Sequence, residues 1–373
     1  MTRALTSDVL IVGGGLVGAS LAVGMARAGA SVRVLDGGDG DIRAARANFG
    51  LIWVQSKGHD MPAYARWTRQ SADLWADFAR EIGEISGVNL HHRQTGGLSY
   101  CLSDDDFEAK RAEIARLHNQ HQAWSPDVSV LDRHQLLALL PGVKLGPRVR
   151  GASFCPQDGE CNPLALLRGL HAILANLGVP IHHETRAVAV TAQDGRFRVT
   201  TERGDFEAAR LVLAAGLGSK PLAESLGIPA PIRPQRGQIL VTERLPSFLP
   251  FAGDTLRQTA DGTVMVGATH EDVGLDMATT STASAALANH AVAVFPDLAN
   301  VNLVRTWGGL RVLTPDGNPL YAESERHPGA VMITCHSGVT LAAAHARLLA
   351  PAILAGPLGP EFAPFSAARF GAS

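Results

Sequence analysis

The chain has 373 residues, which is enough for two or three domains, and its 33 Lys and Arg residues nearly balance 35 Asp and Glu residues. This balance argues against a nucleic-acid partner, because phosphates are neutralised by a basic face. The cysteines Cys101, Cys155, Cys161 and Cys335 form no Cys-x-x-Cys pair, so we expect no metal site and reduced, cytoplasmic thiols. No stretch approaches the ~20 apolar residues of a membrane span, so we expect no membrane-spanning segment.

The N-terminal region carries the strongest local pattern. A short apolar strand that begins at Asp8 runs into GGGLVG, residues 13–18, and an Ala-rich helix and a second strand ending at Asp36 follow. This order is the dinucleotide fingerprint. We expect Gly13 to make the tight turn, Gly15 to let the backbone approach a pyrophosphate and Gly18 to let helix and strand pack closely. Leu16 and Val17 complete the turn, and Asp36 is placed to accept hydrogen bonds from a ribose.

Two helical stretches and a buried strand come next. Apolar residues recur at helical spacing over 61–83 and 104–122, and Ser103 stands where a helix N-cap is expected. An apolar strand within residues 207–219 then closes on Ala215 and Gly216. Such a strand is typical of the second nucleotide motif of flavoproteins, and a buried strand with a glycine turn is the alternative.

The segment WGGLRVLTPDG, residues 307–317, poses a charge problem. Arg311 stands between Leu310 and Val312 in a strand that suits a sheet interior. An arginine in such a place must reach solvent or meet an anion. The alternative to a bound anion is a structural pairing with Asp316 or Glu323.

The C-terminal region repeats the strand, turn and helix order. An apolar strand starts at Val331, a turn covers residues 335–340, and an Ala-rich helix spans residues 341–354. This unit would direct a second helix N-terminus toward a flavin ring or its ribityl chain. The three nucleotide elements together favour FAD over NAD.

With these elements in order, the chain resembles the D-amino-acid-oxidase-like family of FAD-dependent oxidoreductases, which includes glycine oxidase and sarcosine oxidases. The run NFGLIWVQSKG, residues 48–58, is similar to the β subunits of bacterial opine oxidases and D-hydroxyproline dehydrogenases. The motifs that carry the family resemblance are GGGLVG (13–18) with Asp36, ANFG (47–50), GECNP (159–163), LAAG (213–216), RGQ (236–238), WGGLR (307–311), TPDG (314–317) and HSGVT (336–340).

The resemblance implies an α/β (α+β) fold. It predicts a Rossmann-like FAD-binding domain of the glutathione-reductase type, built from residues 1–85, 145–218 and 308–373. Residues 86–144 and 219–307 would form a substrate-binding domain with an antiparallel sheet. Strands expected near Gly237 and Thr263 suit that sheet.

The resemblance also implies which residues contact the cofactor. The predicted FAD-binding residues are Gly13, Gly15, Leu16, Val17, Gly18, Asp36, Asn48, Phe49, Gly50, Ala187, Ala215, Gly216, Gly309, Ser337, Gly338, Val339 and Thr340. Gly309 stands where monomeric sarcosine oxidases carry the cysteine that tethers flavin, so noncovalent FAD is expected. Met265 stands near the position of the lysine associated with oxygen activation, which implies weak use of oxygen.

Arg311 falls on the family position that binds the substrate's carboxylate. A planar guanidinium offers two parallel donors to such a group. His270 and His336 are further candidate catalytic contacts, with structural histidines as the alternative. The implied reaction is hydride transfer from the carbon bearing the amine to FAD, which gives an imine that water hydrolyses. The substrate would be an amino acid or opine with a carboxylate, and Arg233 and Arg257 are loose candidates for a second anion site.

The β-subunit resemblance implies partner subunits that carry a second flavin or an iron–sulfur centre. The loop with Trp53, Gln55 and Lys57 is a candidate for part of the electron-transfer surface or for a cover over the FAD. Two alternatives stay open. One is a free-standing oxidase of glycine, sarcosine or D-amino acids, and the other is an accessory flavoprotein subunit that only relays electrons.

Overall fold

The computed structural model describes residues 4–38, 44–120 and 127–371. One part of the molecule is built on an eight-stranded sheet with the order β17-β18-β11-β1-β2-β8, in which β10 also pairs with β11 and β9 pairs with β10. Strand β1 (Leu5–Val12) lies parallel between β2 (Val32–Leu35) and β11 (Gly204–Leu213), and β18 (Ala330–Thr334) lies parallel to β11. The carboxyl ends of these four strands therefore meet at one edge, the usual place for a ligand in an open parallel sheet. The remaining strands are β8 (Ile181–His182), β9 (Ala187–Gln193), β10 (Arg196–Thr201) and β17 (Leu320–Glu323).

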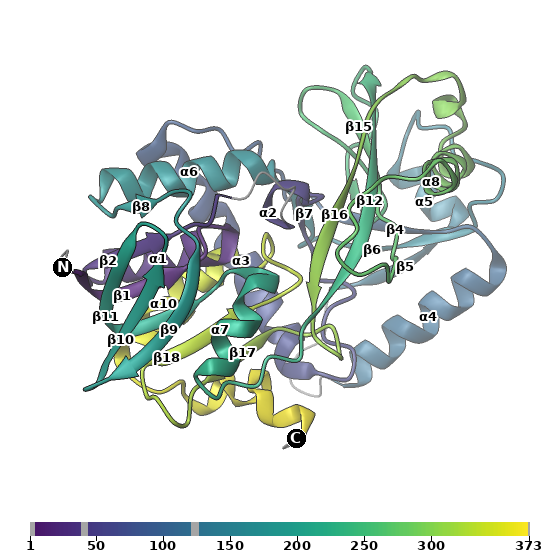
Figure 1. The fold of residues 1–373 in the computed structure, drawn as a ribbon. Helices are drawn as coiled ribbons and strands as arrows, with labels where there is room; N and C mark the ends of the chain where they lie inside the picture. Colours follow the sequence, from purple (N-terminus) through teal and green to yellow (C-terminus); the bar gives the residue numbers. More distant parts are fainter. Residues whose placement is uncertain (1–3, 39–43, 121–126, 372–373) are drawn as a thin grey trace.

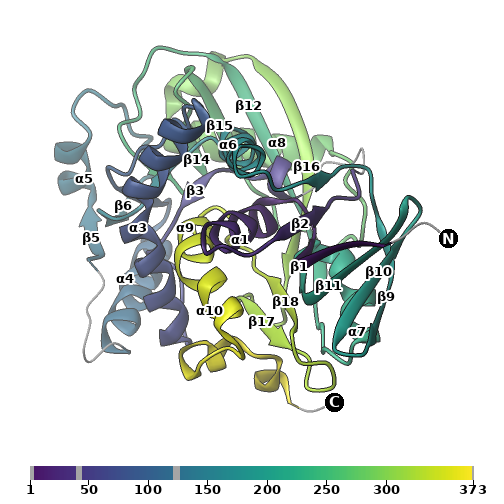
Figure 2. The same cartoon turned by 90° about the vertical axis from the view of Figure 1, so that its left-hand side faces the viewer.

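The two faces of this sheet are covered differently, as Figure 2 shows. Val9 and Ile11 belong to a core shared with helices, whereas Leu10 and Val12 belong to a core on the opposite side, as the strand period of two requires. The β9–β10 hairpin and α7 (Ser219–Ser225) lie on that opposite side. The helical face carries α1 (Leu16–Arg27), α3 (Pro62–Ser86), α6 (Pro163–Asn176) and the C-terminal segment formed by α9 (Ala342–Ala344), the π-helical turn η3 (His345–Leu349) and α10 (Ala350–Ala355).

The other part of the molecule, on the right of Figure 1, contains two four-stranded sheets with the orders β14-β15-β12-β16 and β13-β4-β6-β5. They share a core with α5 and α8 that contains Leu98, Leu240 and Leu287. The strands are β4 (Gly97–Cys101), β5 (Ser129–Asp132), β6 (Gly151–Cys155), β12 (Arg233–Arg244), β13 (Ala252–Gly253), β14 (Leu256–Gln258), β15 (Thr263–Gly267) and β16 (Leu303–Leu313). The helices are α4 (Asp104–Asn119), α5 (Arg133–Leu139) and α8 (Ser281–Val294).

Short elements join the two parts. Helix α2 (Ala44–Ala47) contacts β16, and β3 (Leu51–Ile52) pairs with β7 (Gly159–Glu160). The 3-10 helices are η1 (Gly216–Gly218), η2 (Pro296–Asn300), η4 (Pro360–Phe365) and η5 (Ala367–Phe370).

The predicted α/β fold is confirmed, and the two expected helices are present as α3 and α4. The side chain of Ser103 caps α4 by accepting a hydrogen bond from the Asp106 amide. This helix ends at Asn119, and residues 121–122 of the expected range lie outside the described residues. Two strands pair across the predicted boundaries between the FAD-binding and substrate-binding segments. β6 pairs with β4 and β5, and β16 pairs along its length with β12.

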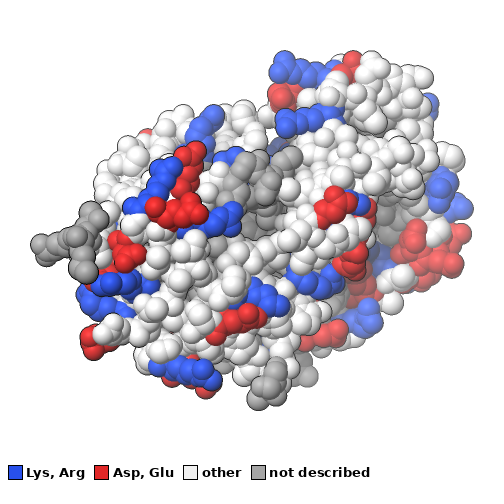
Figure 3. All heavy atoms as spheres, in the orientation of Figure 1, with Lys and Arg blue, Asp and Glu red and all other residues white. Residues whose placement is uncertain are grey.

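The face of the molecule shown in Figure 3 carries charges of both signs, interspersed among uncharged residues. Within the described residues, no single helix has the length and apolar character needed to cross a membrane. Ala342–Ala355 and Pro360–Phe370 pass that test only as a pair bent by 111°.

Candidate functional site

The turn after β1 is shaped so that only glycine fits at two of its positions. A Cβ atom on Gly13, whose φ is +112°, would lie 2.4 Å from the Ala214 carbonyl oxygen. One on Gly18 would lie 1.9 Å from the Gly13 carbonyl oxygen. At Gly15, the N-cap of α1, the nearest atom would be 3.8 Å away. The backbone at Gly15 is therefore open to a ligand at the positive end of the α1 dipole.

Asp36 holds this turn from the end of β2. Its carboxylate accepts hydrogen bonds from the backbone amides of Gly14, at 2.8 Å, and Gly38, at 2.9 Å. Leu35 and Gly37 line the adjoining cavity and Asp36 does not. The ribose contact expected of Asp36 stays a prediction, and the structure adds a second role in fixing the glycine turn.

Two cavities meet above the strand ends. The glycine-turn cavity, of about 540 Å³, is bounded by β1, β11, β18 and α1, and the arginine cavity, of about 430 Å³, is bounded by β12, β16 and the turn after β18. The two cavities adjoin, because both are lined by Asn48, Leu310 and His336, among others. The predicted residues that line the first cavity are Gly13, Gly15, Leu16, Val17, Asn48, Ala187, Ala215, Gly216, His336 and Gly338. Those that line the second are Asn48, Phe49, His270, Gly309, Arg311, His336, Ser337, Val339 and Thr340.

Three predicted cofactor residues, Gly18, Asp36 and Gly50, do not line either cavity. Gly50 has a φ of +93°, and a Cβ atom there would lie 2.4 Å from the Cys161 carbonyl oxygen. Its amide donates to the Asn48 side chain at 2.8 Å. These three residues shape the backbone around the space.

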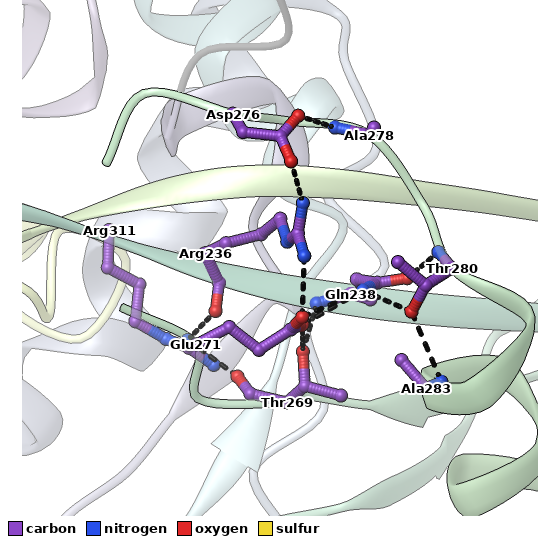
Figure 4. A network of polar contacts seen from close by, with 9 residues as sticks. All are labelled: Arg236, Gln238, Thr269, Glu271, Asp276, Ala278, Thr280, Ala283 and Arg311. Atoms are coloured by element: carbon purple, nitrogen blue, oxygen red, sulfur yellow. Dashed lines mark hydrogen bonds and ion pairs between the residues drawn. The ribbon is translucent and has the colours of Figure 1, made fainter. Parts of the chain in front are cut away.

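Arg311 projects into the arginine cavity from β16. Its Nη1 donates to the Thr269 carbonyl oxygen at 2.7 Å and to the Arg236 carbonyl oxygen at 3.3 Å, as Figure 4 shows. A Cβ atom on Gly237 of β12 would lie 2.7 Å from both terminal nitrogens, so the guanidinium packs directly against this glycine. Within residues 4–38, 44–120 and 127–371, Nε and Nη2 of Arg311 have no hydrogen-bond partner. The guanidinium is thus positioned by backbone oxygens on one side and available on the other.

The structural pairing considered for Arg311 is absent from the described part of the chain. Asp316 pairs with Arg369 at 2.8 Å, and Glu323 accepts a hydrogen bond from the Leu358 amide at 3.0 Å. Arg311 has no carboxylate partner among the described residues. An anion in the cavity would therefore be its natural partner.

A charged network lies behind Arg311 and fixes the loop that holds it. Buried Arg236 forms ion pairs with Glu271, at 2.7 Å, and Asp276, at 2.5 Å, and Gln238 donates to Glu271 at 2.9 Å (Figure 4). The hydrogen bond from Arg236 lowers the pKa of Glu271 to about 2. The negative charge of Glu271 is thus committed to Arg236 and leaves Arg311 free for a ligand.

The two candidate histidines both line the arginine cavity. Removal from water lowers the pKa of His270, and the charge of Arg311 lowers it further. Burial also holds the pKa of His336 well below its ordinary value, and the charges of Lys57 and Arg311 lower it further. Both imidazoles are therefore neutral near neutral pH and can accept hydrogen bonds.

The loop after β3 lies over the cavity. Trp53 and Lys57 line the arginine cavity, and Trp53 and Gln55 are only 5% and 2% exposed. This burial favours a covering role over an outer transfer surface. Asp254, Thr255, Ala268 and Cys335 also line the cavity and were not expected from the sequence, because loop residues outside a motif give no signal of direction.

The sequence matches the profile described as "FAD dependent oxidoreductase" over residues 8–352. The chain belongs to this family of FAD-dependent oxidoreductases. It is 41% identical to an opine oxidase subunit of Rhizobium meliloti over 98% of both chains. It is also 41% identical to the corresponding opine oxidase subunit of Agrobacterium tumefaciens over 97% of both chains.

Solved structures of other proteins share the fold. Glycine oxidase from Geobacillus kaustophilus superposes with a TM-score of 0.89 at 22% identity, covering 97% of this chain and 98% of that one. L-proline dehydrogenase from P. horikoshii superposes with a TM-score of 0.83 at 20% identity, covering 97% and 98%.

FAD is the cofactor, and the cavities fit it. The glycine-turn cavity includes the open backbone of Gly15 and adjoins the arginine cavity at Leu310. The glycine-turn cavity suits the diphosphate of FAD, because it lies at a helix N-terminus. In the arginine cavity, Gly237 and Gly309 have no side chains, which leaves room for the flat flavin ring.

Proposed function

We propose that this chain is the catalytic subunit of an amine dehydrogenase complex, with an N-substituted amino acid such as an opine as its substrate. Its two 41% identical relatives are both named as subunits of an opine oxidase. FAD, when bound, supplies a hydride acceptor. Loss of a hydride from the carbon bearing the amine and of a proton from its nitrogen leaves an imine, which water hydrolyses to a carbonyl compound and a freed amine.

The observation that carries this proposal is the position of Arg311. Its guanidinium faces the arginine cavity without a carboxylate partner in the described residues, while two carbonyl oxygens hold its Nη1. Two parallel N–H donors suit the substrate's carboxylate, and such charge-assisted bonds contribute about 1.5–3 kcal/mol. Anchoring the carboxylate positions the neighbouring carbon for reaction.

The neutral imidazoles of His270 and His336 complete the polar lining. We assign them to contacts with the substrate's amine, because a neutral imidazole nitrogen accepts a hydrogen bond from an N–H group. Their lowered pKa values keep them from adding positive charge beside an amine that must lose its proton.

We also propose that the FAD is held without a covalent bond. Gly309 offers no thiol, and burial raises the pKa of Cys335, which lines both cavities, to about 12. The thiol of Cys335 is then protonated at neutral pH and a poor nucleophile. Extraction of the flavin by denaturation without proteolysis would agree with this assignment.

We retain the division into an FAD-binding part and a substrate-binding part as a proposal, with two adjusted boundaries. β6 goes with the substrate-binding part because it pairs with β4 and β5. All of β16 goes there too, since it pairs with β12.

Replacement of Arg311 tests the proposed function. Arg311→Met should slow anaerobic bleaching of the bound flavin by an opine by at least about tenfold, because about 1.4 kcal/mol of carboxylate binding corresponds to a factor of ten. Arg305→Met is a matched control, since Arg305 lies on the same strand but is exposed. Equal bleaching rates in Arg311→Met and the unaltered protein would contradict the carboxylate contact of Arg311, whereas unchanged turnover by a complex that contains Arg311→Met would favour the accessory relay function.

A further inference from the structure

Lys57 is a second cation in the arginine cavity, and its backbone is firmly held. The Trp53 amide donates to Thr340 Oγ1 at 3.1 Å, and the Val54 amide donates to the Asp158 carboxylate at 2.5 Å. The Lys57 amide closes a turn on the Val54 carbonyl oxygen at 3.0 Å. These contacts fix the loop, so the position of the Lys57 side chain beside the cavity follows from the fold.

The charge of Lys57 is not committed to an ion pair in the described part of the chain. The three other lysines, Lys110, Lys144 and Lys220, lie 2.7, 3.4 and 4.0 Å from a carboxylate. Burial lowers the pKa of Lys57, and its acidic neighbour Asp158 opposes this shift in part. The Asp158 carboxylate also accepts hydrogen bonds from Val54 and Gln55. Burial also raises the pKa of Asp158 to about 7, which reduces its negative charge.

The other cations considered for a second anion site are already engaged. Arg233 forms an ion pair with Asp272. Arg257 donates to the Phe49 carbonyl oxygen and lies 3.4 Å from Glu160. Neither lines the arginine cavity. Lys57 therefore takes the place that these two arginines were expected to fill.

The cavity offers little negative charge of its own to balance Lys57 and Arg311. Among the described residues, Asp254 is the only carboxyl group that lines it, and it accepts a hydrogen bond from Ser99 at 2.6 Å. Burial raises the pKa of Asp254 and so favours its neutral form. Two like charges in a poorly solvated space repel each other, and a ligand with two anionic groups relieves both.

We propose that Lys57 binds a second carboxylate of the substrate, so that the arginine cavity selects amines flanked by two carboxylates over amines that carry one. This inference rests on the proposed function, in which Arg311 binds the first carboxylate. Lys57 then determines specificity, and Arg311 remains the anchor that all substrates share.

Two thioethers test this selection without turnover, because sulfur replaces the oxidisable amine. Thiodiacetate carries two carboxylates and methylthioacetate carries one, and calorimetry with the FAD-loaded protein gives the dissociation constant of each. Lys57→Gln should raise the dissociation constant of thiodiacetate at least about tenfold and change that of methylthioacetate less than about twofold. Lys57→Arg should restore most of the affinity for thiodiacetate, and Lys144→Gln, at an exposed lysine, should behave like the unaltered protein.

The outcomes separate this inference from the proposed function. If Arg311→Met weakens both thioethers and Lys57→Gln weakens neither, the proposed function stands and the second carboxylate site is wrong. The same holds if Lys57→Gln only slows reoxidation of the reduced flavin by oxygen. If Arg311→Met changes neither affinity, the proposed function itself fails. The visible flavin spectrum of each variant shows that its FAD site is intact.

Discussion

Gly309 and Gly237 face each other across β16 and β12 and form the floor of the arginine cavity. A Cβ atom on Gly309 would lie 2.2 Å from the Cβ atom of Ala47 in α2. The motif around Gly309 could be recognised in the sequence. The sequence also predicted that Arg311 faces a bound anion, and its side chain lines the arginine cavity. The direction of Lys57 could not, because a loop has no periodicity from which a facing side chain can be inferred.

The close approach of Gly309 and Ala47 predicts that a substitution at one position can be compensated by a substitution at the other. Gly309→Ala should weaken FAD binding, because overpacking of this kind costs about 1–3 kcal/mol. Adding Ala47→Gly removes the clashing methyl group and leaves the Ala47 Cα position 3.7 Å from the new Cβ atom. The FAD dissociation constant, measured by equilibrium dialysis, should rise in the single variant and recover in the double variant. Equal values in both variants would show that the clash is not what sets FAD binding.

At the scale of elements, a buried polar chain ties three segments together. Trp67 of α3 donates to the Tyr321 hydroxyl of β17 at 2.8 Å, and this hydroxyl shares a hydrogen bond of 2.8 Å with Nε2 of His345. Burial lowers the pKa of His345 to about 3. The Ala-rich C-terminal helix was predictable, whereas its π-helical turn at His345 and this contact depend on tertiary packing.

His345 makes stability depend on pH. Its folded pKa of about 3 lies below the ordinary value of 6.5, so the unfolded chain binds the extra proton between these values. The stabilisation is complete above pH ~6.5 and is lost as the pH falls. Between pH ~7.5 and ~5.5, the unfolding free energy should fall by about 1.4 kcal/mol more in the unaltered protein than in His345→Gln. Denaturant unfolding at both pH values measures the difference, and parallel losses would argue against a neutral buried His345.

At the scale of the whole molecule, the family resemblance predicted the Rossmann-like part, to which the four parallel strands belong. Pairing within the two antiparallel sheets was less accessible, because strands such as β4, β6 and β13 are distant in sequence and short. Tertiary contacts and not local propensity decide such pairing. The family assignment likewise needed the whole order of motifs.

The choice of electron acceptor is a question at the scale of the whole molecule. Met265 is buried in β15, is uncharged and does not line the arginine cavity, so it offers no charge to stabilise superoxide. We expect the isolated, FAD-loaded chain to oxidise its substrate faster with an artificial dye than with oxygen. Parallel assays of dye bleaching and peroxide formation measure the two rates. Peroxide formation as fast as dye reduction would instead identify a free-standing oxidase.

The neighbours of β1 in the central sheet come from residues 32–35 and 204–213, and β18 at 330–334 completes the parallel set. During synthesis, β1 can pair with β2 early, but its other edge stays uncovered until β11 has been made. Such non-local pairing slows folding and leaves apolar strand edges exposed in the nascent chain. A chain that stops before Thr334 would lack Cys335 and His336, which line both cavities. Such incomplete chains should therefore fail to retain flavin and should be degraded.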